Sequence, residues 1–284
     1  MLSIIIPAFN EETVIEACLD SLLQQKRDSK SQNFLFEIIV AANGCYDKTV
    51  FLCKNYYDLM AERGIKFIVL ELTEGNKNNA INTADNIASF SSRLYLDADV
   101  VCEPFLVAQI ITLLDVSSPR YASGTLAIQD GPSFFSRAYG KIWRKTPYIR
   151  DTIPGCGCYA VNNSGRKLWK KFPMIHSDDK FVRLLFDHSQ RKQASAKYFW
   201  PLPQGFFTLL KIRIRWIHGN RQLVSSFPEL QENDSKRLKV DLDFLKTVLS
   251  NPISTIVFLT IYFLAATYAY LKPKTNTIRW TRAR

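Results

Sequence analysis

The sequence predicts an α/β protein in which helices flank a mostly parallel sheet. Short β-branched runs alternate with segments of helical periodicity through the first hundred residues, a pattern typical of β-α-β units. The 284-residue chain is 47% hydrophobic, which is enough to bury the core of one large domain with additional elements. An uncharged apolar stretch at 253–271 predicts a further helix at or in a membrane.

Four strands are predicted in the first hundred residues, at 3–7, 36–41, 65–70 and 93–97. Apolar residues recur at helical spacing in each of the three segments that separate these strands. Parallel strands bring their carboxyl ends to one edge of the sheet, and ligands of such sheets bind beyond that edge. The polar residues that follow the strands are therefore candidates for a binding site.

Two carboxylates, Asp97 and Asp99, follow the fourth strand. Alternate residues of a strand share a face, so both side chains are expected to point the same way. Oxygen ligands of this kind suit Mg²⁺ or Mn²⁺, which leave their other coordination positions to water and substrate phosphates. The alternative is that both residues only end a strand in a turn, where aspartate is common.

The net charge of +11 favours phosphate-bearing partners such as a nucleotide, a nucleic acid or an anionic membrane. No recognised nucleic-acid-binding module is visible, so no nucleic acid partner is expected. The six cysteines are mostly scattered and predict reduced cytosolic thiols. The first residues have no basic leader and only a short apolar run, so we expect no signal peptide.

The turn after the first strand excludes two common nucleotide sites. Neither a Gly-x-Gly-x-x-Gly motif nor a Gly-Lys-Ser/Thr motif is present. The turn instead contains Pro7 and Asn10, followed by Glu11 and Glu12. The two glutamates also suit the start of a helix, because carboxylates interact favourably with the helix dipole there.

Four segments in order, at 3–12, 43–49, 75–82 and 96–99, resemble the motifs of the inverting family-two glycosyltransferases, which have the GT-A fold. The resemblance extends over residues 1–223 and is strongest up to about residue 100. We therefore expect a GT-A glycosyltransferase domain at 1–223 and a membrane-associated segment at 224–284.

The resemblance implies a site for a nucleotide-sugar donor. The family holds the nucleotide with the turns after the first two strands, although Ala42 stands where the family usually has a base-reading Asp. It places Lys77 near the diphosphate, Asp99 on the metal, and Asp97 on the ribose or on metal-bound water. The implied donor residues are Pro7, Phe9, Asn10, Glu12, Asn43, Lys77 and Asp97.

The resemblance also implies a catalytic base. A glycine-bearing loop at 154–161 resembles the loop that lines the acceptor side, and the acidic pair Asp178-Asp179 matches the family's pair, whose second member is the base. Asp179 would take the proton of the acceptor hydroxyl as it attacks the sugar. The alternative is a helix start, with Ser177 as N-cap and two aspartates in the first turn.

A basic segment at 211–221 resembles the Gln-x-x-Arg-Trp region of processive members, with Ile212 in the Gln position. The mismatch argues against a processive polymer synthase. Arg215 is a candidate contact of the diphosphate and His218 a candidate ligand of the metal. A basic helix at a membrane surface would explain the same residues without chemistry.

Two segments indicate a membrane. Aromatic and basic residues at 132–150 suit a lipid surface or a polyisoprenyl phosphate, although an amphipathic helix that packs on the sheet has the same composition. The stretch at 253–271 is followed by basic residues, which for a single crossing from the cytoplasm would violate the positive-inside tendency. A spanning helix and an in-plane or re-entrant segment are both retained, with a buried core helix third.

These observations predict a metal-dependent inverting glycosyltransferase with Mg²⁺ or Mn²⁺, on the cytoplasmic face of a membrane. It would move one sugar from a nucleotide diphosphate, UDP-sugar first, to a hydroxyl of a glycan or lipid-linked acceptor in cell-surface polysaccharide or glycolipid synthesis. One alternative is an inactive nucleotide-sugar-binding or membrane scaffold protein on the same fold. A nucleotidyltransferase is disfavoured, because it would show a Gly-rich loop after the first strand.

Overall fold

The fold was analysed in a computed structural model, which describes residues 1–27, 34–234 and 240–272. The chain divides into two compact units. Unit 1 comprises Met1–Ala127, Gly155–Met174 and Leu185–Trp200, and unit 2 comprises Ile128–Pro154, Ile175–Leu184 and Pro201–Arg284. The domain boundary expected after residue 223 falls near the end of a long helix of unit 2 and stays a prediction.

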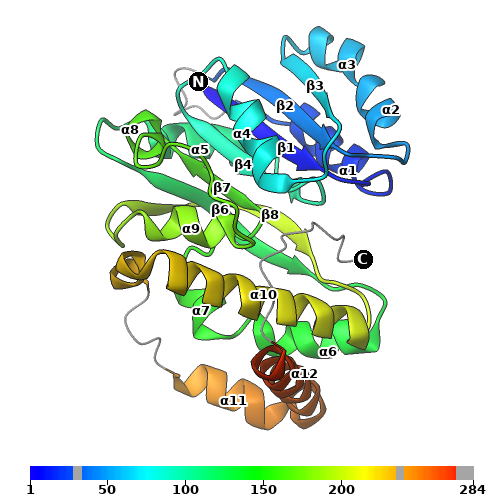
Figure 1. The fold of residues 1–284 in the computed structure, drawn as a ribbon, viewed down its shortest axis with the longest axis vertical. Helices are drawn as coiled ribbons and strands as arrows, with labels where there is room; N and C mark the ends of the chain where they lie inside the picture. Colours follow the sequence, from blue (N-terminus) through cyan, green and yellow to red (C-terminus); the bar gives the residue numbers. More distant parts are fainter. Residues whose placement is uncertain (28–33, 235–239, 273–284) are drawn as a thin grey trace. The chain divides into compact units, whose positions relative to one another are not determined.

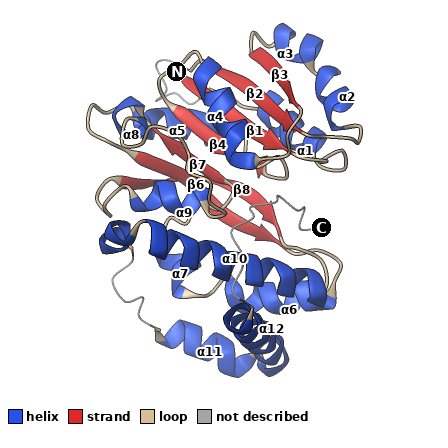
Figure 2. Ribbon diagram, viewed as in Figure 1, coloured by secondary structure: helices blue, strands red, loops and turns tan. Residues whose placement is uncertain are grey.

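An eight-stranded sheet in the order β3-β2-β1-β4-β7-β6-β8-β5 forms the framework of unit 1 (Figure 2). Strand β1 pairs in parallel with β2 and β4, and β2 with β3, whereas the β4–β7, β6–β7 and β5–β8 pairs are antiparallel. Only the last residues of β6 and β8 belong to unit 2. The strands are β1 (Leu2–Ala8), β2 (Phe36–Asn43), β3 (Lys66–Leu72), β4 (Arg93–Leu96), β5 (Val101–Cys102), β6 (Tyr121–Gln129), β7 (Cys158–Val161) and β8 (Arg191–Pro201).

Strand β1 lies inside the sheet, and every one of its residues is buried. Because both of its faces are covered, the strand is mostly apolar. Pro7 is tolerated near its end. The β1–β4 pairing stops at Ile5 and Tyr95, so the missing N–H of Pro7 leaves no gap in that ladder.

Helices form in all three segments between the first four strands, as the periodicity predicts, whereas α5 and α8 were not predicted. The segment from Val50 to Met60 forms two helices, because the backbone N–H of Tyr56 bonds back to Cys53 in a tighter three-residue turn. The helices are α1 (Ile15–Leu23), α2 (Thr49–Lys54), α3 (Tyr57–Glu62), α4 (Lys77–Ile87), α5 (Leu106–Leu114) and α8 (Asn163–Arg166).

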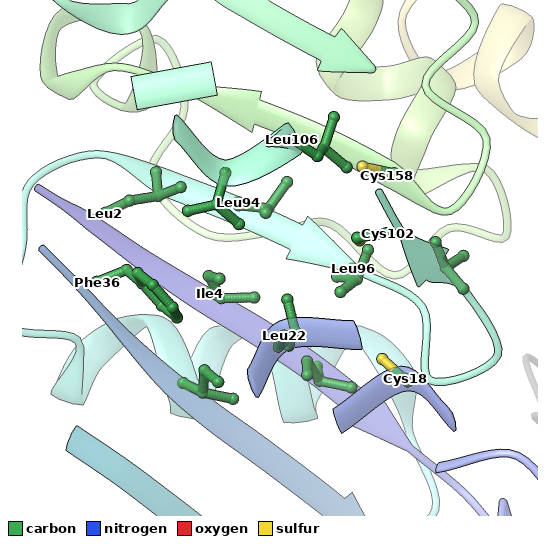
Figure 3. Packing of buried hydrophobic residues seen from close by; sticks show 14 of the residues in the cluster. Leu2, Ile4, Cys18, Leu22, Phe36, Leu94, Leu96, Cys102, Leu106 and Cys158 are labelled. Atoms are coloured by element: carbon green, nitrogen blue, oxygen red, sulfur yellow. The ribbon is translucent and has the colours of Figure 1, made fainter. Parts of the chain in front are cut away.

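The main core lies between the sheet and helices α1 and α5. Leu2 and Ile4 of β1 pack with Leu94 and Leu96 of β4 and with Leu22 of α1 (Figure 3). Ile5 lies outside this cluster, as its alternate position in β1 requires, and α4 contacts β1 and β2 from the other face. The sheet is therefore covered by helices on both faces, and this packing holds the carboxyl ends of its parallel strands in position.

Unit 2 consists mainly of helices (Figure 1). The segment at 132–150 gives α6 and most of α7, and the apolar stretch at 253–271 gives α12, which contacts α6, α10 and α11. By length and composition α12 is able to cross a membrane. The helices are α6 (Phe134–Trp143), α7 (Pro147–Asp151), α9 (Asp178–Leu184), α10 (Phe206–Ser226), the 3-10 helix η1 (Pro228–Asn233), α11 (Leu242–Ser250) and α12 (Pro252–Leu271).

Candidate functional site

The turns that follow β1 and β2 are hydrogen-bonded to each other. Asn10 adopts a left-handed backbone with φ of 55°, and its side-chain oxygen accepts the N–H of Tyr46 at 3.0 Å. The N–H of Asn10 donates to the Cys45 sulfur at 3.4 Å, and the Asn43 amide donates to the carbonyl of Ala8 at 2.8 Å. Asn is one of the few residues that tolerate this backbone conformation. Two of the predicted donor residues, Asn10 and Asn43, thus hold the two turns together.

Glu12 belongs to the same connection. Its carboxylate accepts the N–H of Lys48, which precedes α2, at 3.1 Å, while its own N–H donates to Asp47 at 3.2 Å. The N–H of Glu11 donates to the hydroxyl of Thr49 at 2.7 Å. The alternative that the glutamates serve only the start of the helix directly after them does not describe Glu12, whose carboxylate accepts a hydrogen bond just before α2.

An aromatic pair borders these turns. The rings of Phe9 and Tyr46 meet edge to face with centroids 6.2 Å apart, and 85% of Tyr46 is exposed. A side chain at Gly44 would place its Cβ 2.9 Å from the backbone nitrogen of Gly75, so this close approach requires glycine. Asn43 is fully buried, and its contact with a nucleobase stays a prediction. Sequence motifs alone did not single out Tyr46, whose signal is a large aromatic residue in an otherwise small, polar turn.

Lys77 stands in the first turn of α4, where a cation is unfavourable to the helix dipole. The helix begins with Asn76 as N-cap, whose side chain accepts the N–H of Asn79 at 3.0 Å. The ammonium group of Lys77 lies 2.9 Å from Asp97, in a half-buried ion pair. This pair offsets the unfavourable position and leaves a cation beside helix N–H groups, which is an arrangement that suits an anionic phosphate.

The Asp97-Ala98-Asp99 segment lies directly after β4. Ala98 and Val100 are buried whereas Asp97 and Asp99 are partly exposed. The strand ends at Leu96, and the N–H of Val100 donates to the carbonyl of Asp97 at 3.1 Å, so the two carboxylates lie in a turn and not on one face of an extended strand. The N–H of Asp97 donates to the carbonyl of Gly157 at 2.8 Å.

Gly157 makes room beside the Asp97 carboxylate. Its φ is +67°, and a Cβ built there would lie 2.9 Å from Asp97 Oδ2. Asp97 and Asp99 supply oxygen ligands of the kind that a hard divalent cation takes together with substrate phosphates. Within the described part of the chain, no three His, Cys, Asp or Glu side chains form a metal-binding group.

Asp85 forms a buried ion cluster that periodicity did not predict. Arg93 of β4 donates to it at 2.6 Å, Arg166 of α8 at 2.7 Å and the Tyr95 hydroxyl at 3.2 Å. Asp85 is 7% exposed, so the two guanidinium groups compensate the cost of burying its charge. The cluster fixes α4, and with it Lys77, on β4.

Cys53 and Cys102 are structural residues of the core of unit 1. Burial raises the pKa of Cys53 and of Cys102 to about 12, and the described cysteines form no disulfide. These two thiols stay protonated at neutral pH and are poor nucleophiles. The expectation of reduced thiols stays a prediction.

The predicted base belongs to unit 2. Asp178 and Asp179 stand in the first turn of α9, with Asp178 buried and Asp179 partly exposed. Further along α9, Lys180 and Arg183 pair with Asp234 at 3.0 Å and 2.8 Å. Burial raises the pKa of Asp234, but hydrogen bonds from these two cations outweigh it and lower that pKa to about 2. The ion pairs anchor the helix that carries Asp179.

Helix α10 approaches the start of α9 through Gly219. A Cβ at Gly219 would lie 2.5 Å from the Ser177 hydroxyl oxygen and 3.1 Å from His176 Cβ. The N–H of His176 also donates to the Gln222 side chain at 3.3 Å. His218, the predicted metal ligand, is the neighbour of this glycine, and its metal role stays a prediction.

The Arg-Trp pair of the basic segment packs within unit 2. Trp216 stacks on Trp143 of α6 with centroids 5.2 Å apart. The guanidinium of Arg213 lies 5.8 Å from the Trp216 ring and 5.0 Å from the Tyr262 ring. Arg215 is partly exposed, and its diphosphate role stays a prediction. Asp179, Arg215 and His218 thus belong to unit 2, whereas the other predicted site residues belong to unit 1.

Comparison with known proteins agrees with this architecture. The family model "Glycosyl transferase family 2" matches residues 3–167. Dolichyl-phosphate beta-glucosyltransferase of Drosophila melanogaster is 33% identical over 101 residues, which are 34% of this chain and 30% of that protein. The match therefore extends over less than a third of that relative's length.

Two solved structures share the fold. The mannosyltransferase PcManGT of Pyrobaculum calidifontis, in complex with GDP-Man and Mn²⁺, has a TM-score of 0.58 at 17% identity, covering 96% of this chain and 76% of that one. S. aureus TarS 1-349 in complex with UDP has a TM-score of 0.52 at 15% identity, covering 95% and 92%. Since the family model spans more than half of the sequence and these relatives share its architecture, the chain belongs to glycosyl transferase family 2 and has the GT-A fold.

Proposed function

We propose that the chain is a metal-dependent inverting glycosyltransferase that moves one sugar from a nucleotide diphosphate donor, UDP-sugar first, to a glycan or lipid-linked acceptor. The observation that carries this proposal is the Lys77–Asp97 ion pair beside Asp99 at the carboxyl edge of the sheet. It combines a cation for phosphate with carboxylates for a metal. The family membership and the complexes of PcManGT with GDP-Man and of TarS with UDP support a nucleotide-bound donor.

Each donor residue has a proposed task. Lys77 and the N-terminal amides of α4 bind the diphosphate. Phe9 and Tyr46 flank the base, while Asn10, Asn43, Glu12 and Pro7 shape the turns that hold it. Because Ala42 replaces the usual carboxylate, we expect recognition of the base to depend more on stacking than on hydrogen bonds.

Asp99 and Asp97 would hold Mg²⁺ or Mn²⁺, which when bound supplies Lewis-acid neutralisation of the departing nucleoside diphosphate. PcManGT was solved with Mn²⁺. Arg215 and His218 are proposed to add a diphosphate contact and a further metal ligand. Inversion at the sugar needs an acceptor oxygen to attack opposite the leaving group. Asp179 is proposed to take the proton of an acceptor hydroxyl in that step.

The acceptor has two candidate chemistries. A hydroxyl must lose its proton and needs the base, whereas a lipid phosphate monoester is already an anion near neutral pH. The name of the Drosophila relative favours a lipid phosphate. An Asp179→Asn variant separates the two, because transfer to a hydroxyl should fall at least about a hundredfold and transfer to a phosphate much less.

The proposed location is the cytoplasmic face of a membrane, supported by the apolar helix α12 and by a net charge of +11. The protein would there contribute to cell-surface polysaccharide or glycolipid synthesis. The competing proposal is a scaffold that binds nucleotide sugars without transferring them, since a fold does not guarantee activity.

Calorimetric titration with UDP, GDP and nucleotide sugars, with and without Mn²⁺, tests the donor site. Metal-dependent UDP binding to the wild type should be lost in Asp99→Ala and retained in Glu62→Ala, which removes an exposed carboxylate of α3. If the wild type bound no nucleotide, the proposal that the chain is a nucleotide-sugar-dependent enzyme would be refuted. Binding without hydrolysis or transfer would support the scaffold.

A further inference from the structure

Helix α12 presents a broad apolar face that no other described helix of unit 2 covers. Its large outward side chains are between 42% and 76% exposed and are Ile253, Ile256, Leu259, Phe263, Leu264, Tyr270 and Leu271. Isolated exposed apolar residues are common, but a contiguous face of this kind marks an interaction site. The contacts that the opposite, covered face of α12 makes limit which partner can bind the exposed face.

The covered face of α12 is held to unit 2 along most of its length. The Thr255 hydroxyl donates to the Val248 carbonyl of α11 at 2.9 Å, and Phe258 packs on Tyr139 of α6 with centroids 5.1 Å apart. Further along, Ile261, Ala265 and Ala269 are fully buried at a helical spacing of four. These contacts start within the first turn and continue to the last.

Two of the groups that meet this face are charged. The Arg213 guanidinium lies 5.0 Å from the ring of Tyr262, halfway along α12, and the Arg221 guanidinium donates to the carbonyl of Ala269 at 2.8 Å. Both arginines belong to α10, which also carries the polar residues Lys211, Arg215 and His218. A guanidinium at the centre of a bilayer is strongly unfavourable.

The length of α12 also disfavours a crossing of the bilayer. Twenty residues of α-helix are about 30 Å long, which is only just the thickness of the hydrocarbon core. To cross, α12 would need nearly all of its residues at membrane depth, and α10 would be drawn in with its arginines. A helix that lies along the membrane surface keeps both arginines at the polar boundary and buries only the outward face.

We propose that α12 lies in the plane of a membrane interface and does not cross the bilayer. Its partner is an anionic lipid surface, which the net charge of +11 favours. Helix α11, which contacts α12, carries an exposed apolar side of its own, because Leu242, Leu245 and Leu249 recur on one side of it and are 73%, 45% and 79% exposed. Both ends of α12 then stay on the side of the membrane that holds the catalytic domain.

A second aromatic group in unit 2 suits the same surface. The N-termini of α6 and α10 bring together Phe134, Phe135, Phe206 and Phe207, whose successive rings lie 5.4 to 5.6 Å apart. Phe207 is 74% exposed, and an exposed lysine, Lys211, follows it one turn later. Aromatic side chains with neighbouring cations are typical of helices that bind lipid interfaces.

This inference rests on the proposed membrane association but not on sugar transfer, so topology mapping tests it separately from activity. The full chain is expressed with one epitope tag at each end, and inside-out vesicles are treated with protease. Both tags should be digested without detergent. A C-terminal tag that is protected until detergent is added would show a crossing helix and overturn the inference. A known spanning helix fused before the C-terminal tag provides the protected control.

Flotation of the purified full chain with phosphatidylglycerol–phosphatidylcholine vesicles tests whether the exposed apolar face of α12 binds lipid. Ile256→Asp and Phe263→Asp should each reduce the partition coefficient by about tenfold or more. Leu59→Asp, at an apolar residue of α3 in unit 1 that is 46% exposed, should leave it unchanged. Equal effects of all three substitutions would contradict the assigned face. A wild-type chain that stays in solution as a dimer would overturn both the inference and the membrane association, because a second copy would then cover α12.

Discussion

Replacing Gly157 by alanine should disturb the Asp97 carboxylate specifically. The left-handed backbone at φ +67° costs an L-residue about 1 to 2 kcal/mol. The added Cβ would also lie 2.9 Å from Asp97 Oδ2 and 3.2 Å from Val100 and Trp200, and overpacking of this kind costs about 1 to 3 kcal/mol. We expect a total loss of about 2 to 5 kcal/mol in the free energy of unfolding, measured by urea denaturation. Metal-dependent UDP binding should weaken by about tenfold or more.

Gly64 supplies the matched control. It has the same φ of +67°, but a Cβ there would meet nothing within 4 Å. Gly64→Ala should therefore show only the backbone cost and leave UDP binding unchanged. The difference between the two variants isolates the contact with Asp97. If both variants lose the same stability and bind UDP equally well, the Asp97 carboxylate is not confined by Gly157, and the reasoning fails.

Three further predictions concern other parts of the chain. Burial raises the pKa of Glu37, but hydrogen bonds from Ser3 and Ser89 outweigh this effect and lower that pKa. The ionised carboxylate therefore stabilises the fold above about pH 4.3, and this contribution is lost as the pH falls through the lowered pKa. The urea midpoints of the wild type and of Glu37→Gln should converge in acid, and midpoints that differ by a constant amount at every pH would contradict this. Gly219→Ala should cost about 1 to 3 kcal/mol in denaturation experiments, because its Cβ would meet the Ser177 hydroxyl, and an unchanged midpoint would exclude that contact. Tyr46→Ala should raise the dissociation constant of UDP about tenfold in calorimetry, whereas Tyr46→Phe retains the ring and should bind like the wild type.

Much of unit 1 could be predicted from local pattern. The strands of the first hundred residues lie within two residues of their expected bounds, because β-branched runs and helical periodicity record which faces are buried. The fold class and the family were confirmed. The antiparallel half of the sheet was not anticipated in detail. Pairs such as Leu96 with Cys158 join residues far apart in the sequence, and periodicity reports that a face is buried but not which strand covers it.

In the candidate site, too, local sequence predicted some features, whereas others depend on tertiary contacts. Motifs identified Lys77 and Asp97, and the structure brings them into contact. The role of Gly157 as a spacer beside the carboxylate depends on a fold that joins the loop before β7 to the end of β4, which no local spacing reveals. For α12, the sequence could not separate a spanning from an in-plane helix. The proposal of an in-plane helix depends on the contact of Arg213 and Arg221 with α12, which is a matter of tertiary packing.

Two ion pairs join α4 to β4 and to Asp97, which directly follows that strand, and they have a consequence for the entropy of binding at the candidate donor site. Lys77 meets Asp97 and Asp85 meets Arg93, so the helix is fastened to the strand at both ends. Eight residues of helix rise about 12 Å, and four residues of strand extend about 13 Å, so the two spacings match. A shift of one residue would break both pairs together. The ammonium group of Lys77 is therefore preorganised, and under the proposed function an incoming nucleotide would not bear the entropic cost of ordering it.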